Sequence, residues 1–201
     1  MTPARHFSSR ALGRETGAVV RVLGVHSRTG SAEAVAVSVA RGAPTLLGRW
    51  TLDLLDGDER QIYHVVVGLP VAEAESRVAA VVEHATAIAT DRIAEIAQRV
   101  SRLAAVGVIV GDFPVPDSLA AILASHTLMH AAEGAMFRDA LLDAATTAGV
   151  RAVGVSRKVA TQRLEGNLAG PVAGVGVAAG RPWRKEHKLA TVAALVAAAG
   201  P

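Results

Sequence analysis

A short, uninterrupted run of apolar residues lies between two long amphipathic patterns in the middle of the chain. Residues 105–110 read AVGVIV and are followed by the turn sequence GDFP. An apolar run of this length, rich in Val and Ile, predicts a strand that is buried on both faces. We therefore expect the α/β fold class, with this run as a central strand of a mixed sheet and helices packed on it.

Three strands are predicted ahead of the central one. The first is rich in β-branched residues, the second alternates Val35, Val37 and Val39 with small residues, and polar or Gly-containing turns separate all three. This spacing predicts an antiparallel meander. A last strand is expected late in the chain. The predicted strands cover residues 18–26, 32–40, 45–55, 105–110 and 151–156.

Helical periodicity dominates the second half of the chain. Apolar residues recur at helical spacing over residues 71–103, a length for which we expect a bend near residues 86–90. A second helix is expected to begin at Asp117 as its N-cap and to end near Gly149. A third follows Pro182 and Trp183, whereas the Gly-rich residues 166–182 are expected to be flexible. Residues 61–69 fit either a short strand or an extended segment.

The composition sets the class of protein. Hydrophobic residues make up 51% of the 201 residues and charged residues 19%, which excludes a disordered chain, while 3% aromatic residues indicate an aliphatic core. We expect a basic, flexible tail over residues 1–17 and a single domain over residues 18–201. The chain has no cysteine, which excludes disulfides, thiolate metal sites and cysteine nucleophiles.

No segment is predicted to act as a secretory signal or to cross a membrane. Residues 1–17 contain no apolar stretch of sufficient length. The longest uncharged run, residues 166–180, is interrupted by Gly and Pro and is shorter than the ~20 apolar residues of a spanning helix. A cytoplasmic location is expected.

The order of elements, together with the segment VLGVHSRTGSAEAVAVSV at residues 22–39, resembles the ribonuclease H-like fold and the first hairpin of RuvC-type Holliday-junction resolvases. The resemblance implies nucleic acid, DNA or RNA, as a partner. It also implies two divalent ions, Mg²⁺ or Mn²⁺, held by three or four carboxylates that clamp the reacting phosphodiester.

The resemblance places the metal site at three points of this chain. The acidic position at the end of the first strand holds His26, the end of the central strand is followed by Asp112, and the start of the last helix offers Glu186. Two interpretations stay open. Either His26, Asp112 and Glu186 form an altered metal site in which Asp112 and Glu186 are catalytic, or the site is degenerate and these residues only end their elements.

A second candidate metal site lies on the second long helix. His126, His130 and Glu133 are spaced i, i+4 and i+7 and therefore share one helix face, where two imidazoles and a carboxylate can hold Zn²⁺. The HExxH order of zinc proteases is absent. The alternative is that the two histidines are amphipathic residues of a packed helix and that Glu133 pairs with Arg138 or caps a neighbour.

Positive charge is concentrated towards the C-terminus. Residues 151–201 hold 8 of the 21 Lys and Arg residues but only 2 of the 18 Asp and Glu residues. These cations can face phosphates, with Trp183 stacking on a base, or they can be a solvated helix face that Trp183 anchors. Arg28 lies in the polar turn after the first strand. The candidate nucleic-acid-binding residues are Arg28, Arg181, Trp183, Arg184, Lys185 and Lys188.

These patterns support three functions. The first is a nucleic-acid-associated ribonuclease H-like domain with weak or lost metal-dependent nuclease activity. The second is a protein-interaction or homo-oligomerisation module, in which the long first helix and the Ala/Val-rich last helix offer apolar faces. The third is a metal-dependent hydrolase that uses the face of His126, His130 and Glu133.

Overall fold

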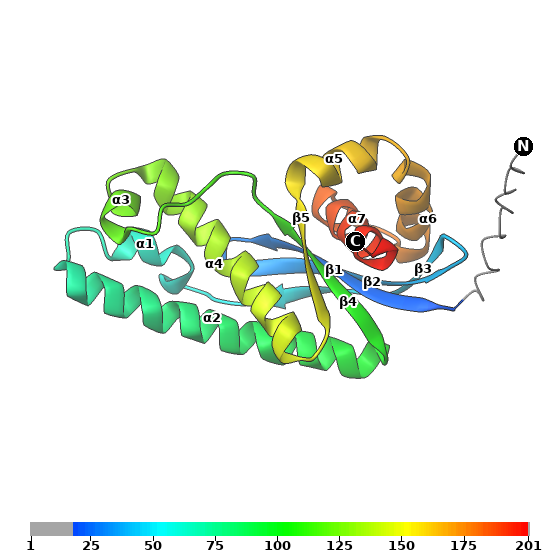
Figure 1. Cartoon of the computed structure of the whole chain (residues 1–201), viewed down its shortest axis with the longest axis horizontal. Helices are drawn as coiled ribbons and strands as arrows, with labels where there is room; N and C mark the ends of the chain where they lie inside the picture. The colour runs from blue at the N-terminus through cyan, green and yellow to red at the C-terminus, as the bar shows by residue number, and fades with distance from the viewer. Residues whose placement is uncertain (1–17, 201) are drawn as a thin grey trace, which may run out of the picture.

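A five-stranded mixed sheet forms the centre of the computed structural model, which describes residues 18–200 (Figure 1). The strand order is β3-β2-β1-β4-β5, in which β1, β2 and β3 are antiparallel and β1, β4 and β5 are parallel. This arrangement confirms the predicted α/β class with its three-strand meander. The predicted tail at residues 1–17 lies outside the described residues. The strands are β1 Val20–Arg28, β2 Ser31–Ala40, β3 Ala43–Asp53, β4 Leu103–Val110 and β5 Arg151–Ser156.

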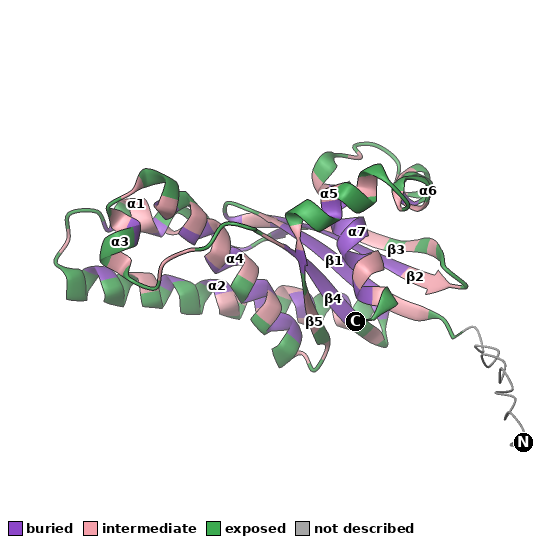
Figure 2. Ribbon diagram, turned by 45° about the horizontal axis from the view of Figure 1, so that its top comes forward, coloured by how far each residue is buried: buried purple, intermediate pink, exposed green. Residues whose placement is uncertain are grey.

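Helices cover both faces of the sheet because successive side chains of each buried strand point to opposite faces. Leu23 and Val25 of β1 pack with α2 (Val71–Val100) and α4 (His126–Thr147) on one face. Val22 packs with α7 (Lys185–Ala199) on the other face. Two shorter helices, α5 (Arg157–Glu165) and α6 (Ala169–Ala179), lie beside α7 (Figure 1). The strands at the centre are therefore the most deeply buried part of the molecule (Figure 2).

Two glycines let α7 lie directly on the sheet. A Cβ atom at Gly24 of β1 would meet the backbone oxygen of Ala190 at 1.7 Å, and one at Gly107 of β4 would meet the backbone oxygen of Ala193 at 2.2 Å. Both contacts involve backbone atoms that cannot rotate away. Gly24 and Gly107 therefore fix the position of α7, whose first turn lies beside the end of β1.

The long first helix differs from the prediction because α2 is one continuous helix without a break at residues 86–90. The two threonines in this stretch do not leave the helix. The hydroxyls of Thr86 and Thr90 each donate to the carbonyl oxygen four residues earlier, at Val82 and Thr86. The helix is therefore not interrupted at the predicted bend.

The second long helix is divided in two. A short helix, α3 (Leu119–Leu123), is capped by Ser118, and α4 is capped by Ser125, whose hydroxyl accepts from the backbone N–H of Leu128. Asp117 is not the cap. The segment before α2 forms the 3-10 turn η1 (Glu59–Gln61) and the short helix α1 (Ile62–Val65) instead of a strand or an extended segment.

The Gly-rich segment is also helical rather than flexible. In α6, Pro171 falls in the first turn, where its missing N–H is not needed. Val172 and Val175, one turn apart, are both buried against α7 and the sheet. This burial stabilises a helix that its glycines alone would disfavour.

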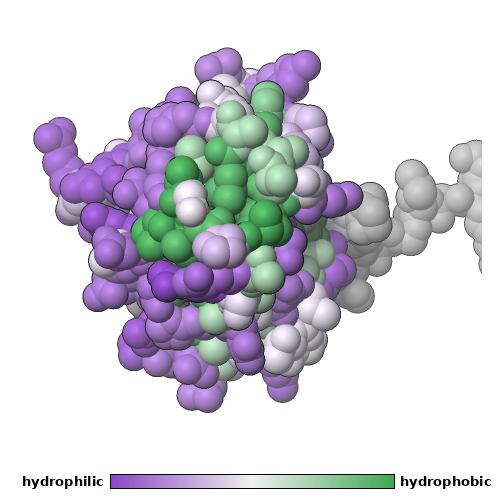
Figure 3. Space-filling model, turned by 90° about the vertical axis from the view of Figure 1, so that its left-hand side faces the viewer, coloured by the Kyte–Doolittle hydropathy of each residue, from purple (hydrophilic) through white to green (hydrophobic). Residues whose placement is uncertain are grey.

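Apolar side chains also gather at one end of the molecule (Figure 3). This apolar end lies at α1, α3 and the start of α2, and includes the exposed residues Val65, Val67 and Val71. The apolar face of α7, in contrast, is buried against the sheet, so it is not available to a partner. Among residues 18–200, no helix has the length and apolar character needed to span a bilayer.

Candidate functional site

The carboxyl ends of β1, β4 and β5 meet at one edge of the sheet because these three strands are parallel. His26 lies near the end of β1, Asp112 follows β4, and α5 begins directly after β5. Glu186 lies in the first turn of α7. We refer to this region as the β1 edge. The structure therefore brings the three residues of the first candidate site to one edge.

His26 is buried at this edge and contacts an arginine. The residue is only 6% exposed, and its Nε2 atom lies 3.3 Å from Nη2 of Arg157 at the start of α5. Burial and the Arg157 charge lower the pKa of His26 from 6.5 to about 4. Because a guanidinium only donates, Nε2 of the neutral ring accepts and the ring proton is on Nδ1, which has no hydrogen-bond partner.

Asp112 is held by the start of α5. One carboxylate oxygen accepts from the hydroxyl of Ser156 at 2.5 Å, and the other accepts from the backbone N–H of Lys158 at 3.1 Å. These two hydrogen bonds lower the pKa of Asp112. The carboxylate therefore orders the turn from β5 into α5 and, through it, the position of Arg157.

These residues do not fit a pair of divalent ions. The ring nitrogen of His26 that would face an ion accepts from a cation instead, and both oxygens of Asp112 are turned to the start of α5, where they accept from Ser156 and Lys158. Within residues 18–200, the side chains at this edge form no group of three closely spaced ligands. The β1 edge therefore does not offer the ligand set of a two-metal site.

A buried carboxylate lies beside His26 on the neighbouring strand. Glu33 of β2 is paired in register with His26, and its Oε2 atom accepts from the Thr51 hydroxyl at 3.0 Å and lies 3.3 Å from Nε2 of His187. Nδ1 of His187 accepts from the backbone N–H of Arg184 at 3.0 Å, so the N–H on Nε2 faces Glu33.

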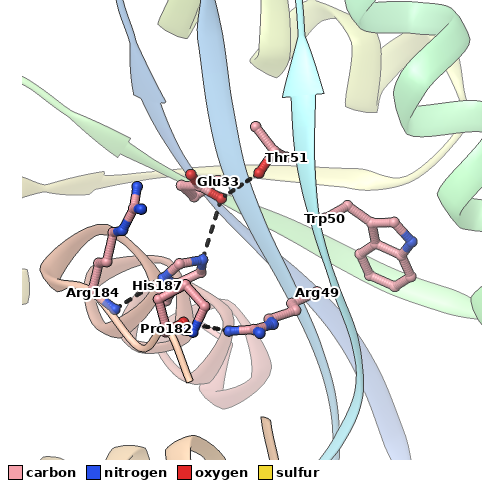
Figure 4. A pocket seen from close by; sticks show the side chains of 7 residues that line it. All are labelled: Glu33, Arg49, Trp50, Thr51, Pro182, Arg184 and His187. Atoms are coloured by element: carbon pink, nitrogen blue, oxygen red, sulfur yellow. Dashed lines mark hydrogen bonds and ion pairs between the residues drawn. The ribbon is translucent and has the colours of Figure 1, made fainter. Parts of the chain in front are cut away.

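A cavity of about 230 Å³ opens next to this pair (Figure 4). Arg49 of β3 closes one side, where its guanidinium donates to the backbone oxygens of Gly180, Arg181 and Pro182. This links the loop before α7 to the sheet. The lining residues are Glu33, Arg49, Trp50, Thr51, Pro182, Arg184 and His187.

Exposed cations surround the β1 edge. The charges of Arg28, Arg157 and Glu186 all act on His26, which places them around it. Glu186 and Asp112 are acidic side chains of this edge, and the pKa of Glu186 is lowered mainly by a hydrogen bond to its own backbone. The neighbouring cations Lys158, Arg184 and Lys185 are also exposed. The edge is therefore rich in positive charge.

The other candidate nucleic-acid-binding residues lie elsewhere. Arg181 and Lys188 line a separate hollow against α6. The Trp183 ring stacks on His187 with 5.4 Å between ring centroids, and its Nε1 atom lies 2.5 Å from where a Cβ of Gly176 would be. This placement favours Trp183 as the anchor of α7 rather than as a platform for a base.

The second candidate site gains a third histidine. His64 of α1 lies against His126 and His130 of α4, with ring centroids 5.0 and 4.6 Å away. We refer to His64, His126 and His130 as the histidine cluster. Glu133 is buried beneath it and contacts Nδ1 of His64 at 2.7 Å and Nδ1 of His130 at 3.2 Å. Glu133 therefore does not pair with Arg138.

Sequence reasoning missed Glu33 and His64 as site residues. For Glu33 a signal existed, because it shares the two-residue alternation of Val35 and Val37 and so had to point to the same buried face. For His64 there was none, since its segment has no clear periodicity.

Comparisons with known proteins identify the fold. No protein-family model matches the chain, and no curated protein matches its sequence. Among solved structures, the chain is similar to RuvC of T. thermophilus in complex with a Holliday junction substrate, with a TM-score of 0.53 at 20% identity over 88% of this chain and 90% of that chain.

The Thermus thermophilus RuvC structure matches with the same TM-score of 0.53, at 18% identity over 88% of this chain and 92% of that chain. These likenesses confirm the predicted ribonuclease H-like fold. At this level of identity they establish the fold alone.

Proposed function

We propose that this chain binds nucleic acid along the β1 edge and does not cleave it by a two-metal mechanism. The observation that carries the proposal is the contact between Arg157 and the buried, neutral ring of His26. In the fold that this chain shares with RuvC, a cation and its neutral partner stand where the resemblance leads us to expect a metal-binding carboxylate.

The electrostatics of the β1 edge suit phosphate. A neutral His26 does not compensate the charge of Arg157, and the planar guanidinium can donate two parallel hydrogen bonds to phosphate oxygens. Arg28, Lys158 and Arg184 add positive charge around it, against the carboxylates of Glu186 and Asp112. In this proposal these cations replace counterions along the backbone, which makes binding dependent on salt and largely independent of base sequence.

The other residues of the edge act as supports. Asp112 holds the turn that presents Arg157, and the Glu33 and His187 pair fixes the first turn of α7, from which Arg184 and Lys185 extend. The carboxylates of Asp112 and Glu33 also repel phosphate, which limits how closely the nucleic-acid backbone approaches these two residues. The arginines and lysines therefore contact phosphate, whereas Asp112, Glu33 and His187 position the helix starts that carry them.

The test is fluorescence anisotropy with labelled single-stranded DNA, duplex DNA, a four-way DNA junction and duplex RNA, followed by a cleavage assay with Mg²⁺ and with Mn²⁺. We expect saturable binding that weakens steeply with salt, and no metal-dependent product. An absence of binding at low salt would overturn the proposal, and metal-dependent cleavage that is lost in Asp112→Ala would overturn its non-cleaving part.

A second candidate function is self-association through the apolar end. Val65, Val67 and Val71 are exposed there, and such a patch is a common feature of contact surfaces. Light scattering of the purified chain measures its mass. A dimer that Val67→Asp converts to a monomer would support this function, and a monomer at all concentrations would exclude it.

A further inference from the structure

We propose that the histidine cluster is a zinc site in which His64, His126 and His130 are the ligands and Glu133 positions two of them. One ring nitrogen of each histidine lies within 4.8 Å of the other two. The inference does not depend on nucleic-acid binding, because the cluster lies on α1 and α4 and shares no residue with the β1 edge.

The arrangement of the three rings fits a common centre. His126 and His130 lie one turn apart on α4, with their ring centroids 4.5 Å apart, and His64 approaches both from α1. Nitrogen ligands of Zn²⁺ lie about 2.0–2.1 Å from the ion, so small rotations of exposed rings close the site. Imidazole nitrogens favour zinc and neighbouring transition metals over Mg²⁺ or Ca²⁺.

Glu133 determines which nitrogens face the centre. Each of its two carboxylate oxygens lies against a different ring, Oε1 against Nδ1 of His64 and Oε2 against Nδ1 of His130. A carboxylate that is only 2% exposed accepts from both Nδ1–H groups, which leaves the Nε2 lone pairs free as ligands. Such an outer carboxylate commonly orients the histidines of zinc sites.

The Nε2 atom of His64 is the independent observation that points to a ligand. It is buried and has no hydrogen-bond partner within the described part of the chain. A buried acceptor without a partner is costly, and a bound ion would remove that cost. The Glu133 carboxylate, 2.7 Å from Nδ1 of His64, holds the ring in this orientation.

The site would be open on one side. His126 and His130 are exposed, so a three-histidine zinc ion would keep a fourth position for water or for an added ligand. This corrects the sequence-based ligand set, in which Glu133 was a direct ligand and His64 was absent.

The experiment is a Zn²⁺ titration of the metal-free, full-length chain by calorimetry, with Co²⁺ absorption as a second readout of coordination geometry. We expect one Zn²⁺ per chain and a Co²⁺ spectrum of tetrahedral type. Affinity should fall by at least about 100-fold in His126→Ala and His130→Ala, and by about 10- to 100-fold in Glu133→Gln.

His84→Ala is the matched control, because His84 is an exposed histidine that pairs with Glu59 outside the cluster. Its affinity for Zn²⁺ should equal that of the unmodified chain. His126 and His130 are exposed, so their Ala variants should fold and can test the site even if His64→Ala does not fold. Circular dichroism shows whether each variant is folded. Zn²⁺ binding that survives in the His126→Ala/His130→Ala double variant, or no saturable binding at all, would overturn the inference.

Discussion

The neutral ring of His26 links the chemistry of the β1 edge to the stability of the fold. Its pKa of about 4 in the folded chain lies below the usual 6.5, because the ring is buried and faces Arg157. Between these two pH values the folded chain binds fewer protons than the unfolded chain, so stability falls as the pH is lowered through this range.

This linkage predicts the pH dependence of unfolding. At about 1.4 kcal/mol per pKa unit, the contribution of His26 amounts to about 3 kcal/mol lost between pH 6.5 and pH 4. The measurement is the free energy of denaturant unfolding across this range for the unmodified chain and for His26→Gln, which cannot titrate. The difference in unfolding free energy between these two proteins should change by this amount between pH 6.5 and pH 4. His84→Ala is the control, and equal pH dependence in the unmodified chain and His26→Gln would contradict the assignment.

At the residue scale, the sequence indicated where the site lies but not what holds it. His26, Asp112 and Glu186 were expected at one edge, and they lie there because parallel strands end on the same side. The contact of Arg157 with His26 spans 131 positions of the chain, and no local pattern encodes it. His64 escaped detection for the same reason, since its ligand geometry depends on how α1 packs against α4.

At the level of secondary structure, the position of α7 on the sheet determines where the cations of its first turn lie. Gly24 and Gly107 leave no space for a side chain beneath the helix, because the atoms that would be met belong to its backbone. A methyl group at either position must push α7 away from β1 and β4.

We therefore predict that Gly24→Ala and Gly107→Ala each lower the free energy of unfolding by about 3 kcal/mol, the upper range for overpacked cores. Gly174→Ala is the matched control, because a Cβ there meets nothing within 4 Å and the position is inside α6. It should raise stability by about 0.5–1 kcal/mol through helix propensity. Urea unfolding of the three variants tests this, and Gly24→Ala as stable as Gly174→Ala would refute the close contact.

The cap of α4 gives a second prediction at this scale. Ser125 accepts from the backbone N–H of Leu128 and separates α3 from α4 directly before His126. Ser125→Ala should cost about 1 kcal/mol in the free energy of unfolding, whereas Asp117→Ala should be close to neutral because Asp117 caps no helix. The same urea experiment compares them, and equal effects would show that Ser125 is not the cap.

Elements with strong periodicity were predictable, and those whose shape depends on packing were not. The meander, the central strand and the last helix follow from alternation and apolar runs. The helical form of α6 does not, because it results from burial of Val172 and Val175 against distant residues. The division between α3 and α4 was missed because one helix was predicted from Asp117 onwards, whereas Ser118 and Ser125 each cap a helix of their own.

At the scale of the whole molecule, the distribution of charge connects the fold to the proposed function. Four of the cations of residues 151–201 reach the β1 edge through the starts of α5 and α7, although the two helices are separated in sequence: Arg157, Lys158, Arg184 and Lys185. Net charge alone, at +3, would not suggest nucleic acid. The arrangement at one edge does, because closely spaced cations release several counterions from one stretch of backbone.

The most direct test of nucleic-acid binding at the β1 edge is the salt dependence of duplex DNA binding for the unmodified chain, Arg157→Ala and Arg99→Ala. Arg99 is an exposed arginine near the end of α2. The next residue, Val100, accepts a hydrogen bond from Arg21 near the start of β1, so Arg99 lies by the opposite end of this strand from His26. We expect Arg157→Ala to weaken binding and to reduce the slope of log K against log salt by about 1, and we expect Arg99→Ala to leave both unchanged. Equal slopes for all three proteins would contradict binding at the β1 edge.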